Sequence, residues 1–229
     1  MTLAQRSTAE ERMDDPALDA ATYAAVLRDL ARVNRVTLAA RPTLRFLDRA
    51  AAGRDRLRIL DVGFGDGDML RWIARWGQRR GIALELVGID LNPRSAAVAR
   101  SDTPAVWAID YRTGDYADLA GKGWDVILSS LVAHHMTREQ LLAFLRFMDG
   151  EARVGWFVND LHRHRFAHLG YPLLARAMRW HPIVRGDGRL SIARSYRPGE
   201  WSPLLHAAAV QDAEVRRMFP FRLCVAKLH

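Results

Sequence analysis

The sequence predicts an α/β fold with a mostly parallel β-sheet. Short apolar runs typical of buried strands alternate with longer helical patterns between residues 57 and 158. A glycine-rich segment, 63–67, stands at the first transition from strand to helix. Only Pro220 separates the last two predicted strands, and so short a connection cannot make a parallel crossover. These two strands must therefore be antiparallel neighbours.

The spacing of apolar residues places the regular elements in order. Two helices are expected before the sheet, one at 20–38 capped by Asp19 and one that begins near Pro42. Five strands are expected at 57–62, 84–89, 107–113, 124–129 and 154–158. The helices between them are expected at 68–79, 93–100 and 137–148.

An insertion, 164–202, is expected after the fifth strand. An amphipathic helix within it is indicated by Phe166, Leu169, Leu173, Leu174 and Met178. Residues 185–189 contain two glycines and predict a turn. The chain is then expected to end with a short helix and a hairpin, at 203–209, 213–219 and 221–227.

The composition excludes several classes of protein. A single cysteine, Cys224, cannot form a disulfide within the chain. No apolar run approaches the roughly 18 residues that span a bilayer, and residues 1–15 lack the apolar core of a secretory signal. A cytoplasmic protein is therefore expected. The net charge of +8 would suit nucleic acid, but it comes mostly from scattered arginines without interleaved aromatic residues.

The glycine-rich segment predicts a site for a nucleoside-bearing ligand. Gly63 and Gly65 allow close approach of a ligand to the backbone at the end of the first strand. Asp90 ends the second strand, where a carboxylate can accept hydrogen bonds from both hydroxyls of a ribose. The alternatives are a tight turn without ligand and an Asp90 that only caps the next helix.

The charges of this segment distinguish between nucleoside ligands. A dinucleotide fingerprint requires glycine or alanine where this chain has Asp68, and Asp66 adds a second carboxylate. Two carboxylates would repel a pyrophosphate but tolerate a sulfonium and an ammonium group. No Gly-Lys-Ser/Thr follows, as a P-loop would require. The segment therefore favours S-adenosylmethionine over NAD or ATP.

These motifs resemble the class I S-adenosylmethionine-dependent methyltransferases of small-molecule type, over roughly residues 53–158 and the terminal hairpin. The family's donor loop, D-x-G-x-G-x-G, is matched by Asp61, Gly63, Gly65 and Gly67. Its ribose-binding acid is matched by Asp90, its acid near the adenine by Asp115, and its segment after the fourth strand by residues 125–135. Residues 159–164 vaguely resemble bacterial methyltransferases found with polyketide pathways.

The resemblance implies a Rossmann-like, seven-stranded, mostly parallel sheet with a C-terminal antiparallel hairpin, and S-adenosylmethionine as the donor. It implies donor contacts by Asp61, Gly63, Phe64, Gly65, Gly67, Asp90, Leu91, Asp115, Tyr116, Ser130 and Leu131. Ordinary core packing is the alternative for Tyr116 and Leu131.

One domain is expected over residues 17–229, after a flexible N-terminus, 1–16. Its parts are a helical cap segment (17–52), a donor-binding core (53–158), an acceptor-side insertion (159–202), and the last helix with the hairpin (203–229). The N-terminal helices and the insertion are expected to form a cap over the acceptor.

Three histidines are candidates for a general base, because imidazole titrates near neutral pH. His134 and His135 follow the fourth strand, and His162 follows the fifth, with Asp160 able to orient it. Structural hydrogen bonding is the alternative for each histidine, and helix capping for Asp160. No metal is expected.

The leading hypothesis is transfer of a methyl group to a small molecule, by O-methylation of a phenolic or polyketide-like compound. C-methylation of a quinone precursor, methylation of RNA or protein, and binding without transfer remain alternatives. No Asn-Pro-Pro-Tyr or Asp-Pro-Pro-Tyr motif follows the fourth strand, which speaks against methylation of a base in nucleic acid. The expected partner is a small-molecule acceptor, with no membrane, and the chain is expected to be a monomer or homodimer.

Overall fold

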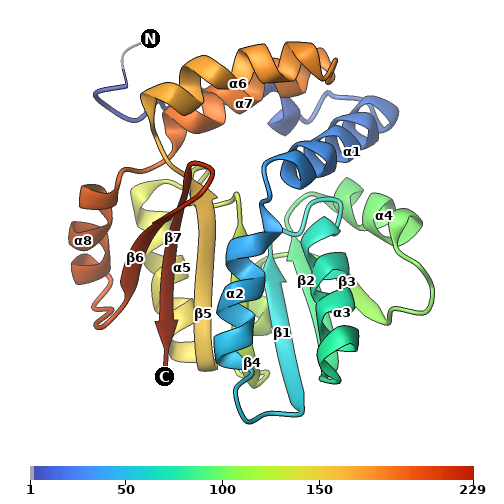
Figure 1. Ribbon diagram of the computed structural model, residues 1–229, viewed down its shortest axis with the longest axis vertical. Coiled ribbons are helices and arrows are strands. Elements are labelled where there is room, and N and C mark those ends of the chain that lie inside the picture. Colours follow the sequence, from blue (N-terminus) through green and yellow to red (C-terminus); the bar gives the residue numbers. More distant parts are fainter. Residues whose placement is uncertain (1–2) are drawn as a thin grey trace.

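The computed structural model describes residues 3–229 and contains one seven-stranded sheet (Figure 1). The strands are β1 (Arg56–Val62), β2 (Ala83–Asp90), β3 (Ile109–Thr113), β4 (Trp124–Ser130), β5 (Ala152–Leu161), β6 (Glu214–Met218) and β7 (Arg222–Leu228). Their order across the sheet is β3-β2-β1-β4-β5-β7-β6. Strands β1 to β5 pair in parallel, and β7 pairs antiparallel with both β5 and β6. The predicted fold class is confirmed.

The helices also follow the predicted order. They are α1 (Ala20–Val36), α2 (Ala40–Ala50), α3 (Asp68–Arg80), α4 (Pro93–Asp102), α5 (Arg138–Glu151), α6 (Arg165–Ala177), α7 (Pro182–Arg194) and α8 (Pro198–Ala207), with 3-10 turns η1 (Arg12–Asp14) and η2 (Tyr116–Leu119). The turn predicted at 185–189 is wrong, because these residues lie inside α7. Gly188 serves packing there, since a Cβ at this position would overlap the ring of Tyr171 on α6.

Helices cover both faces of the sheet (Figure 1). On one face, α2, α3 and α4 pack against a core that includes Phe46, Leu70 and Phe157. On the other face, α5 and α8 pack against a core that includes the fully buried Trp124 and Trp156. These two cores fix the sheet, so the carboxyl ends of the parallel strands form one rigid edge.

Helices α1, α6 and α7 form a cap beyond that edge (Figure 1). Their common apolar cluster contains Val26 of α1, Ala175 of α6, and Ile183 of α7. Helix α2, which belongs to the predicted cap segment 17–52, lies on the sheet instead. Its Phe46 stacks on Phe157 of β5 with ring centroids 4.9 Å apart. The cap therefore consists of one N-terminal helix and the two helices of the insertion.

The N-terminal segment, for which a flexible chain is predicted, lies against the cap. Residues 1–2 fall outside the described residues. The amide of Ser7 donates to the carbonyl of Ala193 at 3.0 Å, and the amide of Met13 donates to Asp187 Oδ2 at 2.9 Å. Glu11 is only 3% exposed. The segment from residue 3 to residue 16 thus has specific partners on α7 and is part of the wall below the cap.

Helix α6 has the predicted location but not a buried apolar stripe. Phe166 and Leu173 are 72% and 73% exposed, and the buried positions of the helix are His168 and Ala175. Helix α7 packs against the side of α6 that carries His168 and Tyr171, which leaves Phe166 and Leu173 outside.

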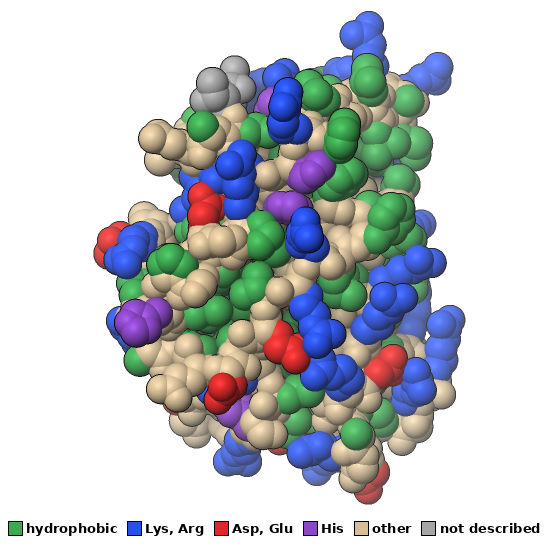
Figure 2. Space-filling model, turned by 60° about the vertical axis from the view of Figure 1, so that its left-hand side comes forward, with side chains coloured by type: hydrophobic (Ala, Val, Ile, Leu, Met, Phe, Trp, Pro, Cys, Tyr) green, Lys and Arg blue, Asp and Glu red, His purple; other side chains and the backbone are tan. Residues whose placement is uncertain are grey.

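The surface carries the excess positive charge in a dispersed form. Figure 2 shows lysine and arginine side chains from the top to the bottom of the visible face, interspersed with hydrophobic and other side chains. Over residues 3–229, no helix combines the length and apolar character needed to cross a bilayer.

Candidate functional site

A cavity of about 680 Å³ lies between the cap and the carboxyl edge of the sheet. Its wall includes the loops that follow β1, β2 and β4, together with α1, α6 and the N-terminal segment. Apolar side chains such as Leu27, Leu30, Val33 and Met136 form much of the lining. A concave, mostly apolar cavity with a few polar groups is the usual form of a small-molecule site.

The loop after β1 brings bare backbone to this cavity. Gly63, Gly65 and Gly67 have φ angles of 76°, 57° and 78°, in the left-handed region that glycine adopts without strain. A Cβ on Gly63 would overlap the side chain of Val132, and a Cβ on Gly67 would overlap the ring of Tyr111. Gly63 and Gly65 line the cavity, whereas Gly67 lies behind it and is required for packing.

Asp90 connects this loop to the end of β2. Its Oδ2 accepts a hydrogen bond from the amide of Gly65, and its Oδ1 accepts one from the amide of Asn92, both at 2.9 Å. Burial raises the pKa of Asp90 above its ordinary value, against the lowering effect of these hydrogen bonds. A carboxylate has about four lone-pair positions, so Asp90 keeps two that can accept bonds from ligand hydroxyls.

Two further carboxyl groups face the cavity without a cationic partner. Asp61 is 1% exposed, and its Oδ1 has no hydrogen-bond partner among the described residues. Burial, reinforced by the charges of Asp68 and Asp90, raises the pKa of Asp61 well above its ordinary value. Burial also raises the pKa of Asp68 to about 7. Asp68 accepts a hydrogen bond from Nδ2 of Asn34 at 3.3 Å, whereas Oδ1 of Asp61 has no partner within residues 3–229. A buried carboxyl group without a partner is costly, and a cationic ligand would compensate it.

Asp66 plays a different part from the one the sequence suggests. Its Oδ2 forms an ion pair with Arg71 at 2.8 Å, and the same guanidinium donates to its backbone carbonyl. The charge of Asp66 is therefore compensated within the protein. The electrostatic preference for a cation comes from Asp61, Asp68 and Asp90 rather than from Asp66 and Asp68.

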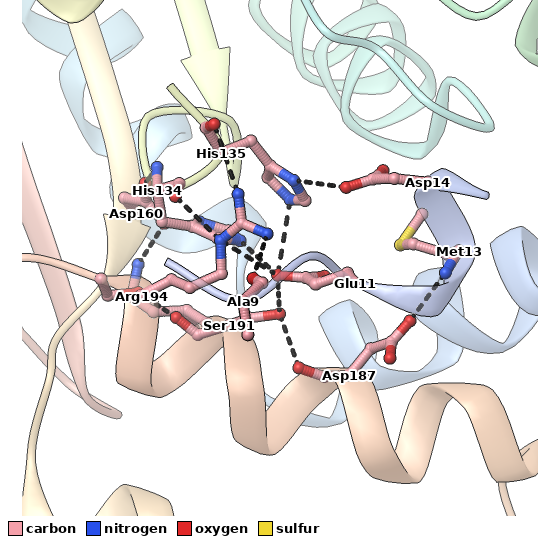
Figure 3. A network of polar contacts seen from close by, with 12 residues as sticks. Ala9, Glu11, Met13, Asp14, His134, His135, Asp160, Asp187, Ser191 and Arg194 are labelled. Carbon is pink, nitrogen blue, oxygen red and sulfur yellow. Dashed lines mark hydrogen bonds and ion pairs between the residues drawn. The ribbon is translucent and has the colours of Figure 1, made fainter. Parts of the chain in front are cut away.

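A second polar cluster lies in the same cavity wall, after β4 (Figure 3). Asp160 holds His134 with both oxygens: Oδ1 is 2.7 Å from Nδ1, and Oδ2 accepts from the backbone amide at 2.8 Å. Asp14 Oδ2 is 3.1 Å from His135 Nδ1. The Nε2 atoms of His134 and His135 lie 3.6 and 3.8 Å from Glu11 Oε1.

Burial and charge act in opposite directions on the carboxyl groups of this cluster. Burial opposes ionisation of Asp160, yet the charge and hydrogen bonds of His134 hold its pKa below its ordinary value. Burial raises the pKa of Glu11 to about 7, although His135, Ser191 and Arg194 all lower it. The cavity wall thus contains a carboxyl group that titrates near neutral pH.

Arg194 of α7 forms hydrogen bonds to two segments around this cluster. Its guanidinium donates to the backbone carbonyls of His134, His135 and Ala9 at 3.2, 3.3 and 3.0 Å. The N-terminal segment, the loop after β4 and the insertion are therefore fixed to one another through a single side chain.

Residues 59–150 match the family model described as a methyltransferase domain. By this match, residues 59–150 form a methyltransferase domain. This match covers β1 to α5, the part of the fold that holds the donor loop and Asp90. The methyltransferase assignment predicted from the sequence is confirmed for this part of the chain, and a similar solved structure contains the predicted cofactor, S-adenosylmethionine. No curated protein sequence matches the chain.

Solved methyltransferase structures share the fold at low sequence identity. Human N-acetylserotonin methyltransferase, in complex with S-adenosylmethionine, has a TM-score of 0.64 and 14% identity, over 92% of this chain and 56% of the human chain. The plantazolicin methyltransferase BamL has a TM-score of 0.63 and 15% identity, over 84% of this chain and 72% of its own. Magnesium protoporphyrin IX methyltransferase from Synechocystis PCC 6803 has a TM-score of 0.57 and 15% identity, over 95% and 91%. This chain therefore spans little more than half of the human enzyme.

The methyltransferase fold brings most of the predicted site residues to one cavity. The cavity is lined by Asp61, Gly63, Phe64, Gly65, Asp90, Leu91, Tyr116, Ser130, Leu131, His134 and His135. Gly67, Asp115 and His162 are not part of its lining. Asp115 is exposed and caps the 3-10 turn η2 by accepting from the amide of Ala117. As adenine ligand it stays a prediction without a contact to the cavity.

The predicted pairing of Asp160 with His162 is wrong. Strand β5 continues to Leu161, so Asp160 lies within the strand and neither caps a helix nor orients His162. In the register of β4 with β5, Ser130 stands opposite Asn159, so the loop after β4 crosses over Asp160 and places His134 on it. His162 is buried and does not line the cavity, and its amide donates to the carbonyl of Phe221.

Sequence reasoning missed Glu11, Asp14 and Arg194. The first two lie in the segment predicted to be flexible, and the third lies in the insertion. None of the three stands near a motif, and Asp14 is separated from its partner His135 by 121 positions. Two carboxylates, Glu11 and Asp14, three residues apart next to the apolar Met13 are the one local feature that could have drawn attention to the segment.

Proposed function

We propose that this protein transfers a methyl group from S-adenosylmethionine to a hydroxyl oxygen of an apolar small molecule, such as a phenolic or polyketide-like compound. The proposal rests on one observation: the donor loop and the Glu11–His134–His135 cluster share the wall of a single apolar cavity. A hydroxyl group held in that cavity would lie between a methyl donor and groups that can accept its proton.

The residues of the cavity have separable tasks in this reaction. Bound S-adenosylmethionine would supply an electrophilic methyl group on a sulfonium centre. Asp90 would bind the ribose hydroxyls, while Asp61 and Asp68 would compensate the donor's positive charge. Ser130 and Leu131, which follow β4, would lie close to the sulfur. The cap excludes water and orients the acceptor, and such positioning supplies much of the rate of a transfer reaction.

The shape of the site favours a small acceptor over a nucleic acid. The cavity lies beneath α6 and α7 and is lined mainly by apolar side chains. Lysine and arginine side chains are spread from the top to the bottom of the face shown in Figure 2, with hydrophobic and other side chains between them. The names of the similar structures point the same way, since N-acetylserotonin and magnesium protoporphyrin IX are small molecules.

Donor labelled in its methyl group tests this proposal. We expect label in small phenols and none in total RNA or protein, when the purified chain is offered phenols, quinone precursors and RNA in parallel. Mass spectrometry of the product then assigns the methyl group to oxygen or to ring carbon. Label in RNA alone would contradict the proposal, and a C-methylated quinone precursor would replace the hydroxyl acceptor by a carbon one.

A further inference from the structure

The N-terminal segment places a buried carboxyl group in the acceptor part of the cavity. We propose that Glu11 accepts the proton of the acceptor hydroxyl during methyl transfer, and that His135, oriented by Asp14, positions it. This inference rests on the proposed function, because it requires a hydroxyl acceptor. It adds a catalytic residue from outside the region that matches the methyltransferase model, which begins at residue 59.

The hydrogen bonds of the cluster leave a place for one proton. The Nδ1 atoms of His134 and His135 each face a carboxylate, so in the neutral rings Nδ1 carries the hydrogen and Nε2 is an acceptor. Both Nε2 atoms face Oε1 of Glu11 at 3.6 and 3.8 Å, beyond ordinary hydrogen-bond length. When both rings are neutral, their two Nε2 acceptors therefore face the carboxylate of Glu11, as the dashed lines in Figure 3 mark. A proton delivered to Glu11 would be shared with the two rings.

Groups from α7 and from the loop after β4 hold Glu11 in this position. Ser191 Oγ of α7 lies 2.9 Å from Oε1, and Arg194 Nε of the same helix lies 4.0 Å from it. His134 and His135 approach from the loop after β4, and Asp14 belongs to the segment of Glu11 itself. Among residues 3–229, no side chain or backbone group hydrogen-bonds to Oε2, so this oxygen can receive the proton.

The electrostatics suit a base that works near neutral pH. Burial raises the pKa of Glu11 to about 7, and a general base is most effective when its pKa lies close to the operating pH. Asp14 has a lowered pKa, because the hydrogen bond from His135, together with the positive charge of that ring when it is protonated, outweighs the burial of Asp14. Asp14 therefore stays ionised and keeps His135 in the tautomer that presents Nε2 to Glu11.

The step balances without a further reactant. The hydroxyl oxygen forms a bond to the methyl carbon while the carbon–sulfur bond breaks, and the electron pair of that bond remains on the sulfur. The hydroxyl proton passes to Glu11 and then to solvent. Ligand atoms of Glu11, His134 and His135 lie within 4.8 Å of one another, a spacing that a metal ion would also fit. Arg194 already supplies a positive charge beside Glu11, which disfavours a metal cation at this position and favours a proton on Glu11.

The test compares Glu11→Gln with Glu10→Gln in the full chain. Glu10 is the exposed neighbour of Glu11, so the second variant makes the same chemical change outside the cavity. The probes are phenols of graded acidity, from 4-methoxyphenol to 4-nitrophenol. We expect Glu11→Gln to lower kcat roughly 10²- to 10⁴-fold for the weakly acidic phenols, with little change in KM. The loss should shrink towards 4-nitrophenol, which ionises without help, and Glu10→Gln should behave as the wild type.

The pH profile provides a second readout that a structural role would not change. Glu11 accepts a proton only when ionised, so wild-type kcat should fall as the pH drops below about 7. This limb should be absent from Glu11→Gln and retained in Glu11→Asp, which keeps a shorter carboxylate. Glu11→Asp also keeps the test decisive if Glu11→Gln fails to fold.

Several outcomes would overturn the inference. They are an unchanged rate in Glu11→Gln, an equal loss for every phenol, and wild-type activity that chelators abolish and divalent metal restores. If the wild type methylates none of the phenols but labels another acceptor, the proposed function fails, and the assignment of Glu11 falls with it. That result differs from an active wild type with a fully active Glu11→Gln.

Discussion

Asp61 offers the sharpest test of how this cavity holds its donor. Its carboxyl group is buried at the end of β1, and its Oδ1 lacks a partner among residues 3–229. In the free protein such a group destabilises the fold, whereas with a bound cation it would contribute to affinity. Asp61→Asn should therefore raise the stability of the free protein and weaken donor binding at the same time.

The size of both effects follows from the environment of the side chain. The raised pKa of Asp61 means that, at pH values between the ordinary pKa and the raised one, the folded chain retains a proton that the unfolded chain has released. Stability consequently falls as the pH rises from the ordinary value near 4 to the raised one, and the amide removes this loss. Relief of about 1 kcal/mol would raise Tm by roughly 2–4 °C in a chain of this size. Loss of a charge-assisted hydrogen bond of about 1.5–3 kcal/mol would weaken binding roughly ten- to a hundredfold.

Thermal unfolding and calorimetry measure the two effects independently. Asp118→Asn is the matched control, because Asp118 is exposed and does not line the cavity. We expect the control to change neither quantity. A less stable Asp61→Asn that binds S-adenosylmethionine with unchanged affinity would refute the reasoning, since Asp61 would then be a structural residue.

Three further substitutions test other parts of the site. Asp90→Ala should weaken calorimetric affinity for S-adenosylmethionine at least about tenfold through lost charge-assisted bonds, and an unchanged Kd would count against a ribose contact. Gly63→Ala should lower the free energy of unfolding by roughly 1–3 kcal/mol, because the φ of Gly63 is positive and the new Cβ overlaps Val132. Adding Val132→Ala should restore only the part of this stability that the overlap costs, and complete restoration would show that the backbone is not strained. Asp160→Asn should reduce stability by roughly 1–3 kcal/mol at neutral pH and should lower kcat by releasing His134. Because the folded state lowers the pKa of Asp160, the stability difference should shrink as the pH falls from the ordinary pKa of aspartate to the lowered one, and a difference that persists at still lower pH would exclude the ionic contribution.

The donor half of the site was predictable because its residues follow one another along the chain. Each strand of this half ends in a short loop, so Gly63, Gly65 and Asp90 stand at fixed distances from apolar runs that mark the strands. Parallel strands bring those loops to one edge of the sheet. Order and spacing therefore carried enough information to predict the fold, the cavity edge and the donor.

The acceptor half depends on contacts between distant segments. Asp160 and His162 are two residues apart in sequence, yet the register of β4 with β5 places His134 within hydrogen-bond distance of Asp160. The placement of α2 on the sheet and of residues 185–189 inside a helix likewise reflects packing partners, Phe157 and Tyr171, that no local pattern reveals.

The sequence by itself determined the order of strands and helices, the glycine loop and the carboxylate that follows the second strand, since each depends on local conformation and periodicity. Only the tertiary structure decided which carboxyl groups face the cavity unpaired, because Arg71 compensates Asp66 and leaves Asp61 without a cation. Only the tertiary structure also brought Glu11 from the N-terminus to His134 and His135. Burial of that one carboxyl group, which gives it a pKa near 7, arises from contacts with α7 and the loop after β4 that exist only in the folded chain.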